Sequence, residues 1–242
     1  MCYHIAIHIT REELEERFNV DYSKNLPHVP QYHVSAFHVP LVPVIQSGSP
    51  EKVVHSQWGL IPYWSKDRTF ADQIRMKTFN ARIEEVTEKP SYKLPIKKSR
   101  CIIPVKGFFE FHTHQNKKYP FYIHSKDQGI FSLAGIYDLW LDRSTGEQFN
   151  TFSILTMDAN PLMEKIHNTK KRMPVMLSES CEKSWLDIST NPEDLISSIN
   201  NDYKIDVDAF PVTKKISKQG VDTNTPEIIT PFKYSELEDL GV

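Results

Sequence analysis

The sequence predicts a single α+β domain over residues 1–242, and three observations lead to that prediction. Many segments rich in aromatic and β-branched residues are short, as is typical of strands. Only a few segments carry helix signals, and they lie among the strands. No repeat, low-complexity linker or compositional break divides the 242 residues, which are enough for one large domain with its own core.

The first elements follow from local patterns. Bulky and smaller residues alternate over 3–9 (YHIAIHI), which predicts a half-buried strand. Thr10 and Glu13 have the spacing of a capping box, so a short helix is expected at 11–18. Further strands are predicted at 53–64, 101–104, 107–111, 119–124, 130–140 and 151–157.

The remaining elements complete the α+β pattern. HTHQNKK at 112–118 is interpreted as a solvated hairpin. Asp158 is a candidate N-cap for a helix at ANPLMEKIH, and Pro192 opens a second helix at PEDLISSI. The 16 prolines are scattered, which favours edge strands and bulges over long regular sheets. From residue 221 onward we expect a surface tail.

Composition excludes several function classes. The formal charge is −2, so any nucleic-acid site must be local. The 8 glycines never occur at the spacing of a P-loop or a dinucleotide fingerprint, so no nucleotide cofactor is expected. Eighteen apolar residues never occur together, and no leader pattern opens the chain, so neither a membrane span nor a leader is expected.

The cysteines and histidines argue against a disulfide framework and a metal site. The 3 cysteines are odd in number and far apart, which favours a reducing, cytoplasmic location. There is no CxxC motif, and the pairs His4/His8 and His112/His114 lack a third ligand at a suitable spacing. We therefore predict neither a metal nor any other cofactor.

Cys2 directly follows Met1 and suggests a specific chemistry. If Met1 is removed, which the small side chain of Cys2 favours, one residue presents both an amine and a thiol. An α-amine with a pKa of about 8 can attack a carbonyl, and the adjacent thiol can then close a five-membered ring. The plain alternative is a terminal cysteine that is merely buried or exposed, since free cysteine often behaves as a small hydrophobe.

Several motifs together carry a family resemblance from residue 1 to about 213. They are the initial MC, QWGLIPYWSKD at 57–67, FNARIEEV and KPSYK within 79–93, RCIIPVKGFFEF at 100–111, LAGIYDLW at 133–140 and FSILTMDANPLMEKIHNTKKRMPVML at 152–177. In order and spacing, the sequence resembles the SRAP family, the SOS response-associated or abasic-site-processing proteins of the YedK and HMCES type. The resemblance implies a mainly antiparallel, bifurcated sheet folded into a pseudo-barrel with flanking helices.

The resemblance also implies an activity. Such a protein binds single-stranded DNA and captures the ring-opened sugar aldehyde of an abasic site through Cys2, leaving a thiazolidine cross-link. Asn80 would orient the terminal residue or the sugar, because its amide donates and accepts hydrogen bonds without charge. Glu110, which lies among aromatic residues, and His167 would transfer protons.

The family resemblance also implies which residues contact the DNA. Arg82 and Arg172 look like phosphate contacts, and Trp64 offers a stacking surface. Basic residues gather near these motifs at 77–82, 97–100 and 165–172, although such a cluster is commonly only a solvated face.

The chain departs from the family pattern at two places. The family usually continues Cys-Gly-Arg, but here Tyr3 and His4 follow Cys2, and His4 would replace the arginine contact in part. Where Arg-Tyr-Asn is common, this chain has Gln31-Tyr32-His33.

Two other functions remain open. Cys2, Glu110 and His167 could form a cysteine-nucleophile peptidase that removes the chain's own first residue. The basic clusters could instead belong to a non-enzymatic single-stranded DNA binder. In every case we expect a monomer.

Overall fold

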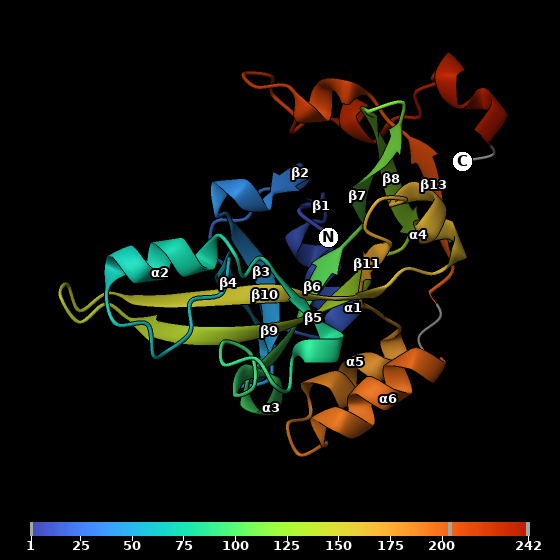
Figure 1. Ribbon diagram of the computed structural model, residues 1–242. Coiled ribbons are helices and arrows are strands. Elements are labelled where there is room, and N and C mark those ends of the chain that lie inside the picture. Colours follow the sequence, from blue (N-terminus) through green and yellow to red (C-terminus); the bar gives the residue numbers. More distant parts are fainter. Residues whose placement is uncertain (1, 203–204, 241–242) are drawn as a thin grey trace.

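The computed structural model describes residues 2–202 and 205–240 (Figure 1). Five strands close into a barrel in the order β4–β3–β6–β9–β10, with β10 returning to pair with β4. The β10–β4 pair is parallel and the other four pairs are antiparallel. The strands are β3 (Leu41–Gln46), β4 (Ser49–Trp58), β6 (Arg100–Val105), β9 (Phe131–Leu141) and β10 (Gln148–Asp158).

Three short strands extend the barrel wall. β5 and β11 both pair with β10, in parallel and antiparallel directions respectively, and β12 pairs with β9. Their bounds are β5 (Asn80–Arg82), β11 (Arg172–Pro174) and β12 (Met176–Leu177). The α+β pseudo-barrel implied by the family resemblance is thereby confirmed.

A second, antiparallel sheet has the order β13–β8–β7–β1–β2. Its strands are β1 (His4–Ile7), β2 (Gln31–Ser35), β7 (Gly107–His114), β8 (Lys117–Ser125) and β13 (Val207–Pro211). Gln115 and Asn116 join β7 to β8 with φ values of 47° and 60°, as a two-residue hairpin requires. The hairpin predicted at 112–118 is confirmed.

The two sheets are joined where the chain passes from β6 to β7. Only Lys106 separates these strands, and its backbone N–H donates to the carbonyl of Ala6 on β1. Gly107 starts β7 because a Cβ there would lie 2.4 Å from the ring of Tyr122 and 2.5 Å from the carbonyl oxygen of Ile123. This junction fixes the sheet that contains β1 and β7 on the barrel.

Helices flank these sheets. They are α1 (Arg11–Phe18), α2 (Arg68–Arg75), α3 (Pro95–Lys98), α4 (Pro161–Ile166), α5 (Glu179–Leu186) and α6 (Pro192–Asp202). The capping box of Thr10 and Glu13 on α1 is confirmed. The N-cap of α4 was predicted wrongly: Asn160, not Asp158, accepts from the backbone N–H of Met163, because β10 continues through Asp158.

The segment from residue 221, predicted as a surface tail, packs against the domain. Ile228 and Leu237 are buried, and the short helix η4 (Pro226–Ile229) contacts β2. Tyr32 on β2 also donates its backbone N–H to the side chain of Asn224, at 2.7 Å. These contacts make the segment a strap over the second sheet, seen at the top of Figure 1.

Candidate functional site

Cys2 lies in the core immediately before β1. Its side chain is fully buried, and its Sγ lies 3.8 Å from the carbonyl oxygen of His4. Burial raises the pKa of the Cys2 thiol far above its ordinary value, and the nearby Glu110 carboxylate raises it further. The sulfur is therefore a protonated thiol at neutral pH and needs a neighbouring base to react. Removal of Met1 concerns a residue outside the described ranges.

Glu110 and His167 meet beside this residue, as their shared motif context predicts. Glu110 extends from β7 and His167 ends α4, and Oε2 of the carboxyl lies 3.8 Å from Nδ1 of the imidazole. Burial raises the pKa of Glu110 to about 7, so acid and base forms coexist near neutral pH. The desolvation expected from its aromatic surroundings therefore occurs.

His167 is held in one orientation. Its Nδ1 bonds to the carbonyl oxygen of Arg172 at 2.8 Å, so Nδ1 carries the hydrogen of the neutral ring and Nε2 keeps a lone pair. Burial lowers the pKa of this imidazole. Glu110 and His167 are thus a pair of adjacent groups whose pKa values burial shifts in opposite directions, which suits proton transfer in both directions.

Asn80 opens β5 and is aligned with Ile154 of β10. Both polar atoms of its amide are buried and have no hydrogen-bond partner within residues 2–202 and 205–240. The preceding ring, Phe79, packs edge-on against Tyr3 at 6.2 Å and shares a core cluster with Cys2. Leaving such groups unbonded costs about 1–3 kcal/mol, so this amide is available to a ligand.

A cavity of about 550 Å³ opens beside these groups. Its walls include Tyr3, His4, Glu110, Phe111, His167 and Lys170. The cavity thus combines aromatic surface, a cation and two proton-transfer groups in one place. Three of the site residues predicted from sequence, His4, Glu110 and His167, line it.

The two predicted phosphate contacts, Arg82 and Arg172, differ in solvent exposure. Arg172 is buried, and its guanidinium bonds to Glu84 at 2.7 Å and to Asp158 at 2.5 Å. Arg82 is half exposed, with Glu84 and Glu85 at 3.7 and 3.5 Å. An incoming phosphate would find Arg82 accessible, whereas Arg172 is already neutralised by carboxylates that tie β11 to β10 and η2 (Ile83–Glu85).

Other predicted surface groups lie apart from the cavity. Trp64 is 41% exposed, packs against the ring of Phe70 at 5.8 Å and does not line the cavity. Arg100, placed by sequence in a basic cluster, is fully buried and donates to carbonyls of Trp185 and Ile96. That part of the predicted basic face is therefore wrong, because Arg100 instead binds the end of α5.

Sequence reasoning missed several wall residues. Phe37 and Lys118 also line the cavity, and His33 bonds to His4 from the neighbouring strand. Phe37 is 52% exposed, a signal that needs the fold, and His33 reaches His4 only through the β1–β2 register. No local pattern identifies these contacts.

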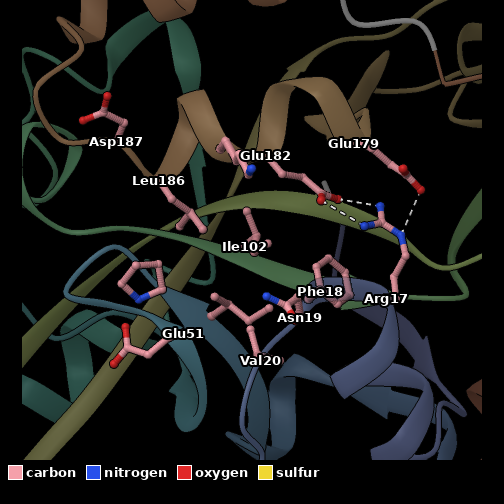
Figure 2. A pocket seen from close by; sticks show the side chains of 13 residues that line it. Arg17, Phe18, Asn19, Val20, Glu51, Ile102, Glu179, Glu182, Leu186 and Asp187 are labelled. Atoms are coloured by element: carbon pink, nitrogen blue, oxygen red, sulfur yellow. Dashed lines mark hydrogen bonds and ion pairs between the residues drawn. The ribbon is translucent and has the colours of Figure 1, made fainter.

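A larger cavity, of about 660 Å³, lies elsewhere, between α1 and α5 (Figure 2). Arg17 bonds to Glu182 at 2.9 and 3.2 Å and to Glu179 at 3.1 Å, while core residues such as Ile102 form its floor. Three of its charged groups, Arg17, Glu179 and Glu182, bind one another, and no thiol or imidazole is among its lining residues. We therefore assign the candidate chemistry to the smaller cavity.

The described residues contain neither a metal-binding cluster nor a membrane-spanning helix. Within 2–202 and 205–240, no group of three or more His, Cys, Asp or Glu side chains is arranged to hold a metal ion. Among those same residues, no helix is both long and apolar enough to cross a membrane.

Comparisons with known proteins agree with the fold and the motifs. Residues 1–219 match the model of the family described as SOS response associated peptidase (SRAP). The chain is 34% identical over 234 residues to the abasic site processing protein YoqW of Bacillus subtilis, covering 95% of this chain and 99% of that protein. It is 29% identical to the abasic site processing protein HMCES of Xenopus tropicalis, covering 74% and 57% respectively.

A solved structure supports the same assignment. A crystal structure of a protein from Bacteroides thetaiotaomicron is 38% identical, covers 96% of this chain and 100% of its own, and superposes with a TM-score of 0.86. Fold, motif order and full-length similarity therefore lead to one conclusion: the chain belongs to the SRAP family.

Proposed function

We propose that this protein processes abasic sites by capturing them covalently through Cys2 once Met1 has been removed. The observation that carries the proposal is the pairing of Glu110 and His167 at one cavity, directly beside the strand that begins after Cys2. Relatives named as abasic site processing proteins support the general activity. Single-stranded DNA is the proposed substrate, and the protein would act on it as a cytoplasmic monomer.

The proposed reaction needs no cofactor. The Cys2 amine adds to the aldehyde carbon of the ring-opened sugar, and loss of water gives an imine. The Cys2 thiol then adds across the C=N bond: sulfur bonds to carbon, and the thiol proton goes to nitrogen, closing a thiazolidine. Every step moves protons, and Glu110 is suited to giving and taking them because its pKa is about 7.

The cavity surroundings suit a DNA strand. Lys118 and Lys170 contribute positive charge at the cavity, and Tyr3, Phe37 and Phe111 give it apolar surface. Binding that depends on such cations weakens with salt and does not depend on base sequence. The unbonded amide of Asn80 remains available to the sugar.

The deciding experiment uses a denaturing gel and an oligonucleotide with one abasic site, with the protein's N-terminus verified by mass spectrometry. Wild type should give a slow-migrating covalent band, and Cys2→Ala should give none. Cys181→Ala is the matched control, because this half-buried cysteine on α5 lies away from the cavity and should leave the band unchanged. A covalent band of normal intensity from Cys2→Ala would contradict the proposal.

The same assay tests the alternatives. A peptidase needs a thiol activated by an imidazole, whereas the Cys2 sulfur contacts a backbone carbonyl and its pKa is raised. Cys2→Ser would keep some hydrolysis under the peptidase hypothesis but would lose the thiazolidine band. Equal affinity for intact and abasic strands, with no band, would identify a non-enzymatic binder.

A further inference from the structure

His4 at the cavity wall, His33 behind it and a threonine on the strap form one hydrogen-bonded chain. Nδ1 of His4 lies 2.8 Å from Nε2 of His33, and the two rings stack with their centroids 5.0 Å apart. Nδ1 of His33 in turn lies 2.8 Å from Oγ1 of Thr223. These residues come from β1, β2 and the segment that follows residue 221, so three distant parts of the sequence meet here.

The chain of bonds leaves one ring nitrogen unused. Two imidazoles have four nitrogens, and three of them are bonded as described. For the fourth, Nε2 of His4, the described residues supply no hydrogen bond, and His4 lines the cavity. Aromatic rings of Phe37 and Phe111 pack against His4. Nε2 is therefore the polar atom that this unit can offer to a ligand.

The direction of the hydrogen bonds in this chain decides whether Nε2 of His4 presents an N–H or a lone pair to the cavity. A neutral imidazole carries one N–H. If the Thr223 hydroxyl donates to Nδ1 of His33, then Nε2–H of His33 donates to Nδ1 of His4, and Nε2 of His4 must carry its hydrogen toward the cavity. The reverse direction would leave a lone pair on Nε2.

We propose that His33 and Thr223 are positioning residues that hold His4 as a neutral N–H donor for a phosphodiester oxygen of the bound strand. This inference rests on the proposed function, since it names a contact for the DNA substrate. Lys118 and Lys170 at the same cavity supply the positive charge that a neutral imidazole lacks. Asn224 fixes the strap by accepting from Tyr32, which keeps Thr223 over His33.

The environment keeps the pair neutral over the working pH range. Burial, followed by His33 and then His38, lowers the pKa of His4 to about 3, and burial together with His38 lowers the pKa of His33 to about 4. Both groups therefore become charged only in strong acid. The other titratable and charged groups around the cavity are Tyr3, Glu110, Lys118, His167 and Lys170. The contact should thus be independent of pH from about 5.5 to 8, where an isolated histidine titrates.

The binding experiment measures the affinity of an intact single-stranded oligonucleotide, which cannot be captured, in a Glu110→Gln background. That background removes the titration of Glu110, and the His167 contribution cancels in the ratio of two variants. His33→Ala should weaken binding about threefold to tenfold at pH 8. Binding should recover in part toward pH 5.5, because loss of the His33 ring removes one cause of the lowered His4 pKa and opens the His4 ring to water.

Companion variants separate positioning from simple loss of structure. His33→Gln should keep the flat pH profile, because its amide N–H can still donate to Nδ1 of His4. Thr223→Val removes the hydroxyl donor and should weaken binding about twofold. His124→Ala is the control, since this histidine lines a different cavity and should change nothing. Equal affinity and an equally flat profile for His33→Ala would overturn the inference.

A spectroscopic test needs no DNA. Nitrogen NMR of histidine-labelled wild type should find the hydrogen of His4 on Nε2 and that of His33 also on Nε2. The opposite tautomers would contradict the inference even if His33→Ala did not fold. A protein that shows these tautomers but forms no covalent band would lack the proposed function while keeping the histidine arrangement, so the two failures are distinguishable.

Discussion

The two cavities of this protein are similar in size, about 660 and 550 Å³, but their polar groups are bonded very differently. In the larger one, Arg17 and Ser132 satisfy the carboxylate of Glu182. At the smaller one, burial raises the pKa of Glu110 to about 7, and the nearby core contains the unbonded amide of Asn80. The difference teaches that cavity volume alone does not identify a reactive site. A pKa shifted by burial and buried polar groups without hydrogen-bond partners are better indicators.

The largest expected effect compares one carboxylate from each cavity. Glu110→Gln should slow adduct formation about 100-fold, because a general acid–base group contributes roughly that much, while affinity for an intact strand changes little. Glu182→Gln should leave the adduct rate unchanged but lower the free energy of unfolding by about 1–3 kcal/mol, because it breaks a buried ion pair. Gel time courses and urea unfolding measure both. A lost affinity with a normal rate would make Glu110 structural.

The pH dependence of stability sharpens the same comparison. The pKa of Glu110 is raised from 4.5 to about 7, so the folded state binds more protons than the unfolded chain in that window. The free energy of unfolding contributed by this group should therefore be full below pH 4.5 and fall as pH rises to about 7, by at most about 3 kcal/mol. Urea unfolding at pH 5 and pH 8 should show this fall, and its persistence in Glu110→Gln would exclude Glu110 as the source.

Replacing Asn80 should raise the stability of the protein and lower its activity. Asn80→Leu replaces two unbonded buried polar atoms with an apolar group of similar size, so the free energy of unfolding should rise by about 1–2 kcal/mol. Adduct formation should slow at the same time, because the amide that we propose orients the sugar is gone. Thermal unfolding and the gel assay together measure this. A less stable variant would indicate that the amide has a structural role.

The smallest effect separates the two arginines. Arg82→Ala should weaken strand binding slightly and reduce the salt slope by about 1, with stability within about 0.5 kcal/mol of wild type. Arg172→Ala should destabilise the fold and leave the salt slope unchanged, because its guanidinium is paired with Glu84 and Asp158. Affinity measured from 50 to 200 mM salt distinguishes the two. A reduced slope in Arg172→Ala would place it on the DNA after all.

The sequence predicted much of the local structure because the signals were local. The alternation over 3–9 and the capping box of Thr10 and Glu13 require only neighbouring residues. Barrel closure was not derivable in this way, since it depends on β10 pairing with both β9 and the distant β4. That feature came only through the family resemblance.

The same distinction between local and long-range signals applies to the candidate site. Motif context predicted Glu110 and His167 as site residues, and their proximity and burial depend on the fold. Arg172 looked like a phosphate contact because a guanidinium in a basic stretch is normally exposed. Glu84, which neutralises it, is 88 residues away in the sequence. In the strap, two buried anchors, Ile228 and Leu237, stand among mostly polar residues, so its packing against the domain has no local sequence signal.

The single residue between β6 and β7 limits how this chain can change length. Side chains alternate between the two faces of a strand, so inserting one codon at Lys106 would turn Glu110 away from the cavity while β6 kept its place in the barrel. The turn between β9 and β10, at 142–147, carries no such restriction. Insertions and deletions among relatives should therefore accumulate at that turn and be absent from the junction, a pattern that sequencing of natural variants can reveal.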